Sequence, residues 1–171
     1  MVFSFVPDYY FDTFDLASAE FLLSLGIRGI ILDVDNTLEP YENPHPGEHV
    51  KKWLSELSSS GIRAAIVSNN NSDRINEFNK ELGLFAISKA KKPLRGNIKR
   101  AMAELGTDKN STAIMGDQIF TDILAGKRCG LAATILVPPI KDKRDFFTRF
   151  KRWLERPILK KYRKREEKRN K

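Results

Sequence analysis

Short apolar runs alternate with stretches of helical periodicity along most of this chain. Five apolar runs have the length of strands, at residues 29–34, 63–68, 84–87, 111–115 and 132–137. Between them, apolar side chains recur at the spacing of amphipathic helices, at residues 47–59, 72–82, 94–105 and 119–129. A glycine lies shortly after each helical stretch, which is typical of a helix end. Strands that alternate with helices build a parallel sheet covered by crossover helices, so the pattern predicts a three-layer α/β fold with five mainly parallel strands.

Composition places this fold in a single domain with a hydrophobic core. The chain has 171 residues, of which 41% are hydrophobic, so it is too apolar for wholesale disorder. No apolar run approaches the roughly 18 residues that a membrane span needs. The N-terminus lacks the basic and apolar segments of a secretory signal, so we expect a cytoplasmic location. Cys129 is the one cysteine, which excludes an internal disulfide and leaves a packing role.

Positive charge is concentrated at the C-terminal end. Residues 141–171 hold 15 Lys and Arg against 5 Asp and Glu, whereas residues 1–140 hold 15 against 17. We therefore divide the chain into a core at 1–140 and a basic amphipathic helix with a tail at 141–171. Within residues 145–155, aromatic and apolar side chains recur at helical spacing opposite Lys and Arg.

Several interpretations of this basic segment are open. The helix suits peripheral contact with an anionic membrane at the inner face, where each basic residue contributes on the order of 1 kcal/mol. The aromatic stripe is equally suited to covering an edge of the sheet. The Lys and Arg run after Pro157 is also typical of a disordered, solvated tail. Nucleic acid is a less favoured partner, because it would not explain the acidic residues described next.

The first predicted strand ends in a pair of acidic residues. Asp33 and Asp35 stand at alternate positions and Thr37 follows two residues later. Strand side chains alternate between faces, so both carboxylates can share one side if the extended conformation continues past Leu32. Two converging carboxylates favour a divalent cation. The alternative is an acidic loop that binds no metal. The residues at the ends of the later strands distinguish between these two interpretations.

Polar residues gather at the ends of the other predicted strands as well. Ser68-Asn69-Asn70 follow the second strand, Lys91-Lys92-Pro93 precede the third helix, and Gly116-Asp117 lead to Asp122 after the fourth strand. Ligands of such sheets bind beyond the carboxyl ends of the strands. Acids, a hydroxyl and a cation gathered at one edge are what phosphoryl transfer requires, because the charge on three phosphoryl oxygens must be neutralised and positioned.

In this order the residues match the four motifs of the haloacid dehalogenase (HAD) superfamily of aspartate-nucleophile phosphatases, which the chain resembles over residues 28–140. The first motif corresponds to residues 33–37, the second to Ser68, the third to Lys92 and the fourth to residues 116–122. The resemblance implies a HAD-like fold. Thirty residues separate Thr37 from Ser68 and twenty-three separate Ser68 from Lys92, which leaves no room for a large cap domain. We therefore expect an open site suited to large substrates, or to a lid borrowed from a neighbouring subunit.

The resemblance also implies a role for each residue. Asp33 is the nucleophile that forms an aspartyl-phosphate, and Asp35 is the general acid and base. The implied cofactor is Mg²⁺, held by Asp33, the carbonyl of Asp35 and Asp117. The remaining roles are phosphate binding by Ser68, Asn69 with its backbone N–H, and Lys92, and support by Thr37 and Asp122, the latter orienting Lys92 or a water on the metal.

Within the superfamily, the motifs most resemble the YqeG-type branch of subfamily IIIA, which includes phosphatidylglycerophosphate phosphatases. Pro7-Asp8, the residues around Asp33, Ser68-Asn69-Asn70 and Lys91-Lys92-Pro93 carry this resemblance. It implies that the substrate is a phospholipid headgroup phosphate, with phosphatidylglycerol as the product.

Other functions stay open at this point. The alternatives are a HAD phosphatase of a soluble or macromolecular phosphoester, and a non-catalytic nucleic-acid or ribosome-binding module that uses the basic tail. A receiver-type signalling domain also combines acids, a hydroxyl and a Lys-Pro pair. Its acceptor aspartate follows the third strand, however, and here Ile87-Ser88 hold that position. The oligomeric state is undetermined by the sequence.

Overall fold

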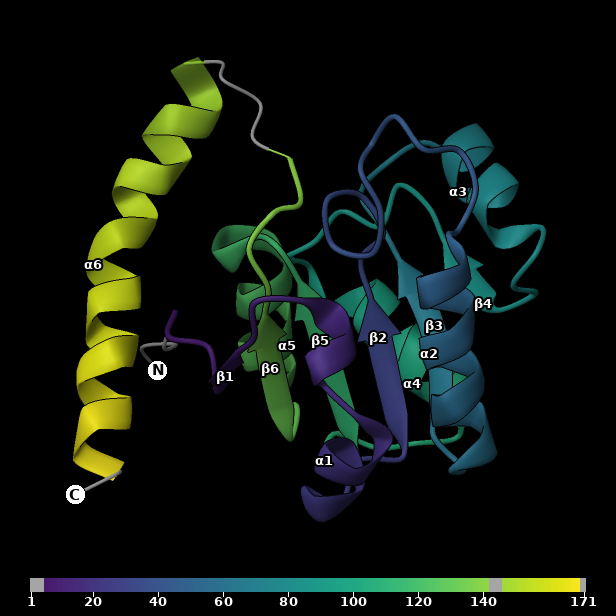
Figure 1. Cartoon of the computed structure of the whole chain (residues 1–171), viewed down its shortest axis with the longest axis horizontal. Coiled ribbons are helices and arrows are strands. Elements are labelled where there is room, and N and C mark those ends of the chain that lie inside the picture. The colour runs from purple at the N-terminus through teal and green to yellow at the C-terminus, as the bar shows by residue number, and fades with distance from the viewer. Residues whose placement is uncertain (1–4, 142–145, 170–171) are drawn as a thin grey trace.

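The computed structural model describes residues 5–141 and 146–169, and only the backbone of residues 146–154, 168 and 169. At its centre lies a sheet of six strands in the order β1-β6-β5-β2-β3-β4, in which every neighbouring pair is parallel (Figure 1). The strands are β1 (Tyr9–Tyr10), β2 (Gly29–Leu32), β3 (Arg63–Val67), β4 (Phe85–Ile87), β5 (Thr112–Gly116) and β6 (Ala133–Leu136). The parallel α/β fold predicted from the sequence is confirmed, with one strand more than expected.

The extra strand is β1, which pairs with β6 at the edge of the sheet. Tyr9 lies opposite Ile135 and Tyr10 opposite Leu136. The strand is only two residues long, so it leaves no alternating pattern that sequence analysis could detect.

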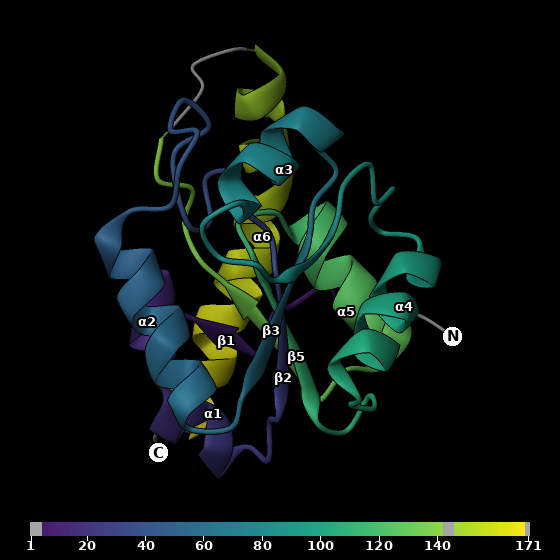
Figure 2. The same ribbon diagram turned by 90° about the vertical axis from the view of Figure 1, so that its right-hand side faces the viewer.

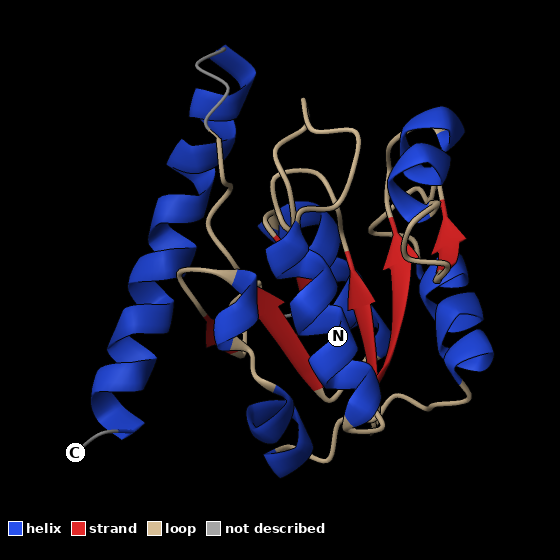
Figure 3. Ribbon diagram, turned by 45° about the vertical axis from the view of Figure 1, so that its right-hand side comes forward, coloured by secondary structure: helices blue, strands red, loops and turns tan. Residues whose placement is uncertain are grey.

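Six α-helices and two shorter helical segments connect the strands in the described ranges (Figure 3). They are η1 (Phe14–Leu16), α1 (Ala19–Ser24), α2 (Glu48–Ser59), α3 (Ser72–Asn79), α4 (Arg95–Leu105), η2 (Ile119–Ile123), α5 (Leu124–Cys129) and α6 (Phe146–Arg169). The helix expected over 119–129 begins instead with a π-helical turn, η2. Helix α3 is capped by Asn71, whose side chain accepts a hydrogen bond from the Arg74 N–H.

Helices cover both faces of the sheet, with α1 and α2 on one side and α4 and α5 on the other (Figure 2). Strand β2 contributes to both layers, because its side chains alternate between faces. Ile30 and Leu32 belong to the core beneath α2, whereas Ile31 belongs to the core beneath α4. Cys129 packs at the margin of this second core, in keeping with its expected packing role.

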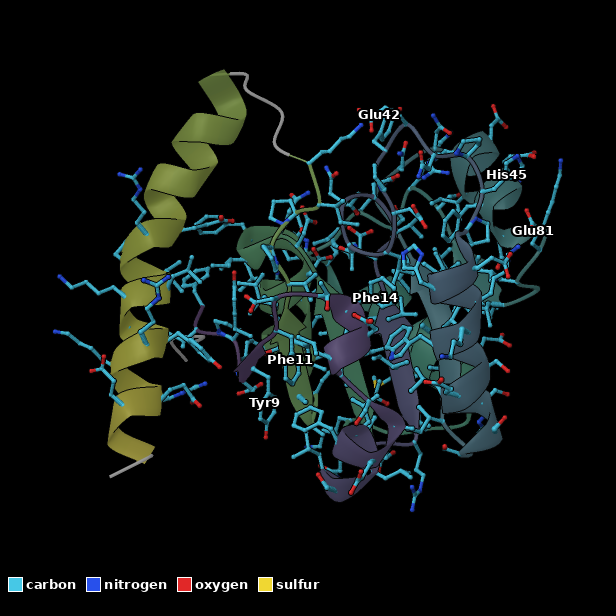
Figure 4. All side chains as sticks on the ribbon, viewed as in Figure 1. Tyr9, Phe11, Phe14, Glu42, His45 and Glu81 are labelled. Atoms are coloured by element: carbon cyan, nitrogen blue, oxygen red, sulfur yellow. The ribbon has the colours of Figure 1, made fainter. Side chains whose placement is uncertain are left out.

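Aromatic side chains fix the N-terminal segment against the first layer (Figure 4). Phe14 packs edge-on against Trp53 of α2, with 5.1 Å between ring centroids. Tyr9 and Phe11 contact Phe21 of α1 at 5.0 and 5.1 Å. The segment before β2 is therefore part of the folded body.

Helix α6 stands beside the β1 edge, and its N-terminal half extends past the carboxyl ends of the strands (Figure 1). Ile158 and Leu159 pack against the small apolar cluster of Tyr10, Ile119, Ile123 and Leu136. Of the interpretations left open for this segment, the disordered tail after Pro157 does not hold for residues 157–169, since the helix continues through this proline and packs on the core. The aromatic stripe within 145–155 lies outside the described side chains. Among the described residues, no helix has both the length and the apolar character needed to cross a membrane.

Candidate active site

Asp33 lies directly beyond β2, at the carboxyl edge of the sheet where β2 borders both β3 and β5. Its N–H donates to the Met115 carbonyl at 3.0 Å, which extends the β2–β5 ladder by one residue. The chain then turns back, because the N–H groups of Thr37 and Leu38 both donate to the Val34 carbonyl. Asn36 adopts a φ of 60° within this turn. Asp33 and Thr37 are thereby held in buried positions at the start of the loop.

Lys92 reaches the same point from the loop before α4. Its Nζ lies 3.0 Å from Asp33 Oδ1 and 2.6 Å from Asp122 Oδ1. Burial lowers the pKa of Lys92, but the carboxylates of Asp122 and Asp33 outweigh it and raise the pKa above the usual value, so the ammonium stays charged. Lys91 is exposed, which agrees with the choice of Lys92 as the inward lysine.

Asn69 fixes the backbone of Lys92. Its Oδ1 accepts the Lys92 N–H at 2.7 Å and its Nδ2 donates to the Lys92 carbonyl at 3.1 Å. The side-chain amide of Asn69 is therefore engaged with the backbone of Lys92, and the predicted phosphate contact could come only from the Asn69 N–H. Ser68 is buried beside it, with its Oγ accepting the Asn70 N–H at 3.2 Å.

A third carboxylate group completes the floor of the site. Oxygen atoms of Asp33, Asp117 and Asp122 all lie within 4.8 Å of one another. Asp117 Oδ1 is buried without a hydrogen-bond partner in the described structure. Burial, with the charges of Asp122 and Asp33, raises the pKa of Asp117 well above its usual value. An orphaned carboxylate oxygen among like charges fits a hard divalent cation, which prefers oxygen ligands.

Asp122 approaches the strand end only because residue 116 is a glycine. A Cβ on Gly116 would lie 2.3 Å from Asp122 Cγ. The Asp122 carboxylate accepts hydrogen bonds from the Gln118 N–H and the Thr121 hydroxyl within the π-helical turn. Such turns are frequent at functional sites, and here one directs Asp122 at Lys92.

The carboxylate of Asp35 has two partners that sequence analysis left unassigned. Asn70 Nδ2 donates to Asp35 Oδ2 at 2.8 Å, and Arg74 Nε donates to Asp35 Oδ1 at 3.1 Å. Arg74 also donates to the Pro44 carbonyl, so it ties Asp35 to the loop that follows it. The sequence offered one indication that Arg74 reaches the site. Arg74 lies in the first turn of α3, and this turn begins just beyond the strand end that carries Ser68.

These residues open into a cavity of about 680 Å³. All but two of the predicted site residues, namely Asp33, Asp35, Ser68, Asn69, Lys92 and Asp117, line this cavity. The exceptions are Thr37 and Asp122, which are buried and do not line it. Residues of α6 form part of the opposite wall, which sequence analysis did not predict.

A parallel three-layer α/β fold with clustered carboxylates and a buried lysine at the carboxyl edge of its sheet defines a phosphoryl-transfer enzyme. Residues 34–136 match the model of the haloacid dehalogenase-like hydrolases, and the chain belongs to this family. It is 38% identical over 155 residues to a Bacillus subtilis protein named probable phosphatase YqeG, covering 91% of this chain and 90% of that relative. The superfamily resemblance and the enzyme class predicted from the motifs are confirmed.

Solved structures share the fold. The cobalt-bound deoxy-D-mannose-octulosonate 8-phosphate phosphatase of Haemophilus influenzae superposes with a TM-score of 0.54 at 18% identity, over 66% of this chain and 69% of that one. A hypothetical protein of Xanthomonas campestris gives 0.53 at 20% identity, over 80% and 74%.

Proposed function

We propose that this protein is a divalent-metal-dependent phosphomonoester hydrolase that works through an aspartyl-phosphate on Asp33. The observation that carries the proposal is the buried cluster of Asp33, Asp117 and Asp122 with Lys92 at the floor of an open cavity. The sequence relative named a probable phosphatase supports the same class of substrate.

In the first step, an Asp33 carboxylate oxygen attacks phosphorus and the bond to the leaving oxygen breaks. Asp35, positioned by Asn70 and Arg74, enters this step protonated and gives its proton to that oxygen, so an alcohol departs and Asp33 carries the phosphoryl group. In the second step, Asp35 takes a proton from water as the water oxygen bonds to phosphorus. The bond between Asp33 and phosphorus breaks, so inorganic phosphate leaves and the carboxylates return to their starting state.

The other residues hold the transferred group. Lys92 neutralises phosphoryl charge as a buried ammonium, and Asn69 fixes the backbone that presents it. Ser68 and Asn69 line the cavity, where the Ser68 hydroxyl and the Asn69 N–H would donate hydrogen bonds to phosphoryl oxygens. Mg²⁺ held by Asp33, the Asp35 carbonyl and Asp117 would neutralise the incoming phosphate and keep the nucleophile ionised.

A phospholipid headgroup phosphate is the substrate we propose, with phosphatidylglycerophosphate converted to phosphatidylglycerol. The motif resemblance favours it, and an open cavity suits a headgroup presented by a surface. The exposed residues Lys160, Lys161, Arg163 and Lys164 lie on α6 away from the packed side chains, and they would face an anionic membrane.

Phosphate release from phosphatidylglycerophosphate in mixed micelles tests this function. We expect release with wild type and Mg²⁺, none with EDTA, and a loss of at least a thousandfold in Asp33→Asn, because an amide cannot act as the nucleophile. Asp15→Asn is the matched control, since Asp15 is exposed in η1 and lies outside the catalytic cavity. Full activity in Asp33→Asn would exclude the covalent mechanism, and equal turnover of unrelated phosphoesters would exclude the lipid assignment.

A further inference from the structure

The catalytic cavity has an outer half that the proposed chemistry does not use. Its inner end holds the acidic cluster, Ser68 and Lys92. Its outer half extends over the end of β6 to α6 and is lined by Leu136, Pro138 and Leu159 with the cations Lys141 and Arg156. At about 680 Å³, the cavity matches the roughly 300–1,000 Å³ of sites for whole small molecules, so it holds far more than a phosphoryl group.

Helix α6 is held firmly enough to serve as a wall of this cavity. The Tyr10 N–H donates to the Tyr162 hydroxyl at 3.1 Å, and Arg165 donates to the carbonyls of Pro7 and Asp8 at 2.7 and 2.8 Å. Leu159 packs against the apolar cluster that contains Leu136, the last residue of β6. These contacts run from Leu159 to Arg165, about two turns of α6, so Arg156 is presented from a docked helix.

The charges of the two halves are opposite. Asp33, Asp117 and Asp122 make the inner end acidic, whereas Lys141 and Arg156 make the outer end basic. Lys141 is exposed and has one described ion pair, to Glu42 at 3.6 Å, which leaves most of its donors to solvent. Glu155 lines the cavity too and already interacts with another residue. Guanidinium groups bind phosphate oxygens in pairs, so Arg156 suits a second phosphate.

We propose that the outer half is the leaving-group site and that Arg156, assisted by Lys141, selects phosphomonoesters whose leaving group carries a second anionic phosphate beyond a short carbon chain. This inference rests on the proposed function, because it assumes that the monoester is hydrolysed at Asp33. It specifies a bis-phosphate substrate class, whether the second phosphate belongs to a membrane lipid or to a soluble molecule.

Two water-soluble substrates test whether the enzyme selects for a second phosphate in the leaving group. Glycerophosphoglycerol phosphate has a terminal monoester and an internal phosphodiester, and glycerol 1-phosphate has the monoester alone. For wild type we expect kcat/KM at least tenfold higher for the first. Arg156→Gln should lower this ratio about tenfold, mainly through KM, because a charge-assisted hydrogen bond is lost. Lys141→Gln should lower it less.

Arg163→Gln is the matched control, since it removes one arginine charge from an exposed position of α6 outside the cavity. We expect its ratio to stay within twofold of wild type. Equal kcat/KM for both substrates in wild type, or the same change in Arg156→Gln and Arg163→Gln, would overturn the inference. Activity that survives in Asp33→Asn would instead overturn the proposed function, so the two failures are distinguishable.

Two further substrates identify the source of the second phosphate. Acylated phosphatidylglycerophosphate in micelles and the free glycerophosphoglycerol phosphate share the headgroup and differ in the lipid. If Arg156→Gln lowers kcat/KM for both of these substrates, the arginine recognises the phosphodiester itself. If Arg156→Gln lowers kcat/KM only for the substrate in micelles, the inference is overturned, because the arginine would then act on the lipid surface.

Discussion

Asp117 is the residue whose environment most clearly calls for a cation. Its pKa is raised above that of an ordinary carboxyl group, so the folded protein without metal binds a proton there more tightly than the unfolded chain does. Its contribution to stability is therefore present below the unfolded pKa and is lost as the pH rises through the folded pKa. Once Asp117 is ionised, the metal-free protein carries an unfavourable cluster of charge that a divalent cation would relieve.

We predict that Mg²⁺ stabilises wild type at pH 7.5 and that Asp117→Asn loses this response. At 100 times the Kd, binding contributes about 2.7 kcal/mol, which corresponds to a rise in Tm of roughly 5–10 °C. Asp117→Asn should also have the higher Tm in EDTA, because the repulsion is removed. Differential scanning fluorimetry with and without MgCl₂ measures both effects, and a wild-type Mg²⁺ response in Asp117→Asn would contradict the metal assignment.

The sequence predicted the residues that gather at the candidate site better than the residues that hold them in place. Asp33, Lys92 and Asp117 follow strand ends, so the parallel topology alone brings them together. Arg74 lies on a helix surface in the sequence pattern, and its contact with Asp35 depends on how α3 packs over the loop. Tertiary geometry of this kind leaves no local signal.

At the scale of elements, the turn from β5 into η2 sets the position of Asp122. Gly116 permits a close approach, and the π-helical turn directs the carboxylate back toward Lys92. The sequence predicted a strand and a helix here, but neither the inserted π turn nor the two-residue strand β1 has a distinct hydrophobic period. The continuation of α6 through Pro157 also lacked a local signal, because a proline normally ends or kinks a helix.

We predict that Gly116→Ala lowers kcat about a hundredfold and destabilises the fold by about 1–3 kcal/mol, as overpacking of a tight contact does. The added methyl group would displace Asp122 and break its 2.6 Å contact with Lys92. Gly96→Ala is the control, because nothing lies within 4 Å of a Cβ at that helical position. Urea unfolding and steady-state kinetics measure the two effects, and wild-type kinetics in Gly116→Ala would show that Asp122 needs no fixed position.

Over the whole molecule, charge and packing divide the described side chains of α6, at residues 155–167, into two faces. Ile158, Leu159, Tyr162 and Arg165 face the core, whereas the basic residues between them are exposed. A truncation after residue 156 would remove packing contacts together with charge, so it would confuse loss of fold with loss of binding. Substitution of exposed lysines separates the two.

We predict that Lys160, Lys161 and Lys164, changed together to Gln, weaken binding to vesicles containing anionic phosphatidylglycerol about a hundredfold. Each basic residue near such a surface contributes about 1 kcal/mol, and each 1.4 kcal/mol is tenfold in affinity. Gln at Lys52, Lys99 and Lys109 gives the same net charge from exposed positions elsewhere. Co-sedimentation should separate the two triple variants at low salt and bring both toward wild type at 0.5 M NaCl, where screening is strong. Equal binding by both variants would mean that net charge, and not the outer face of α6, attracts the protein to the surface.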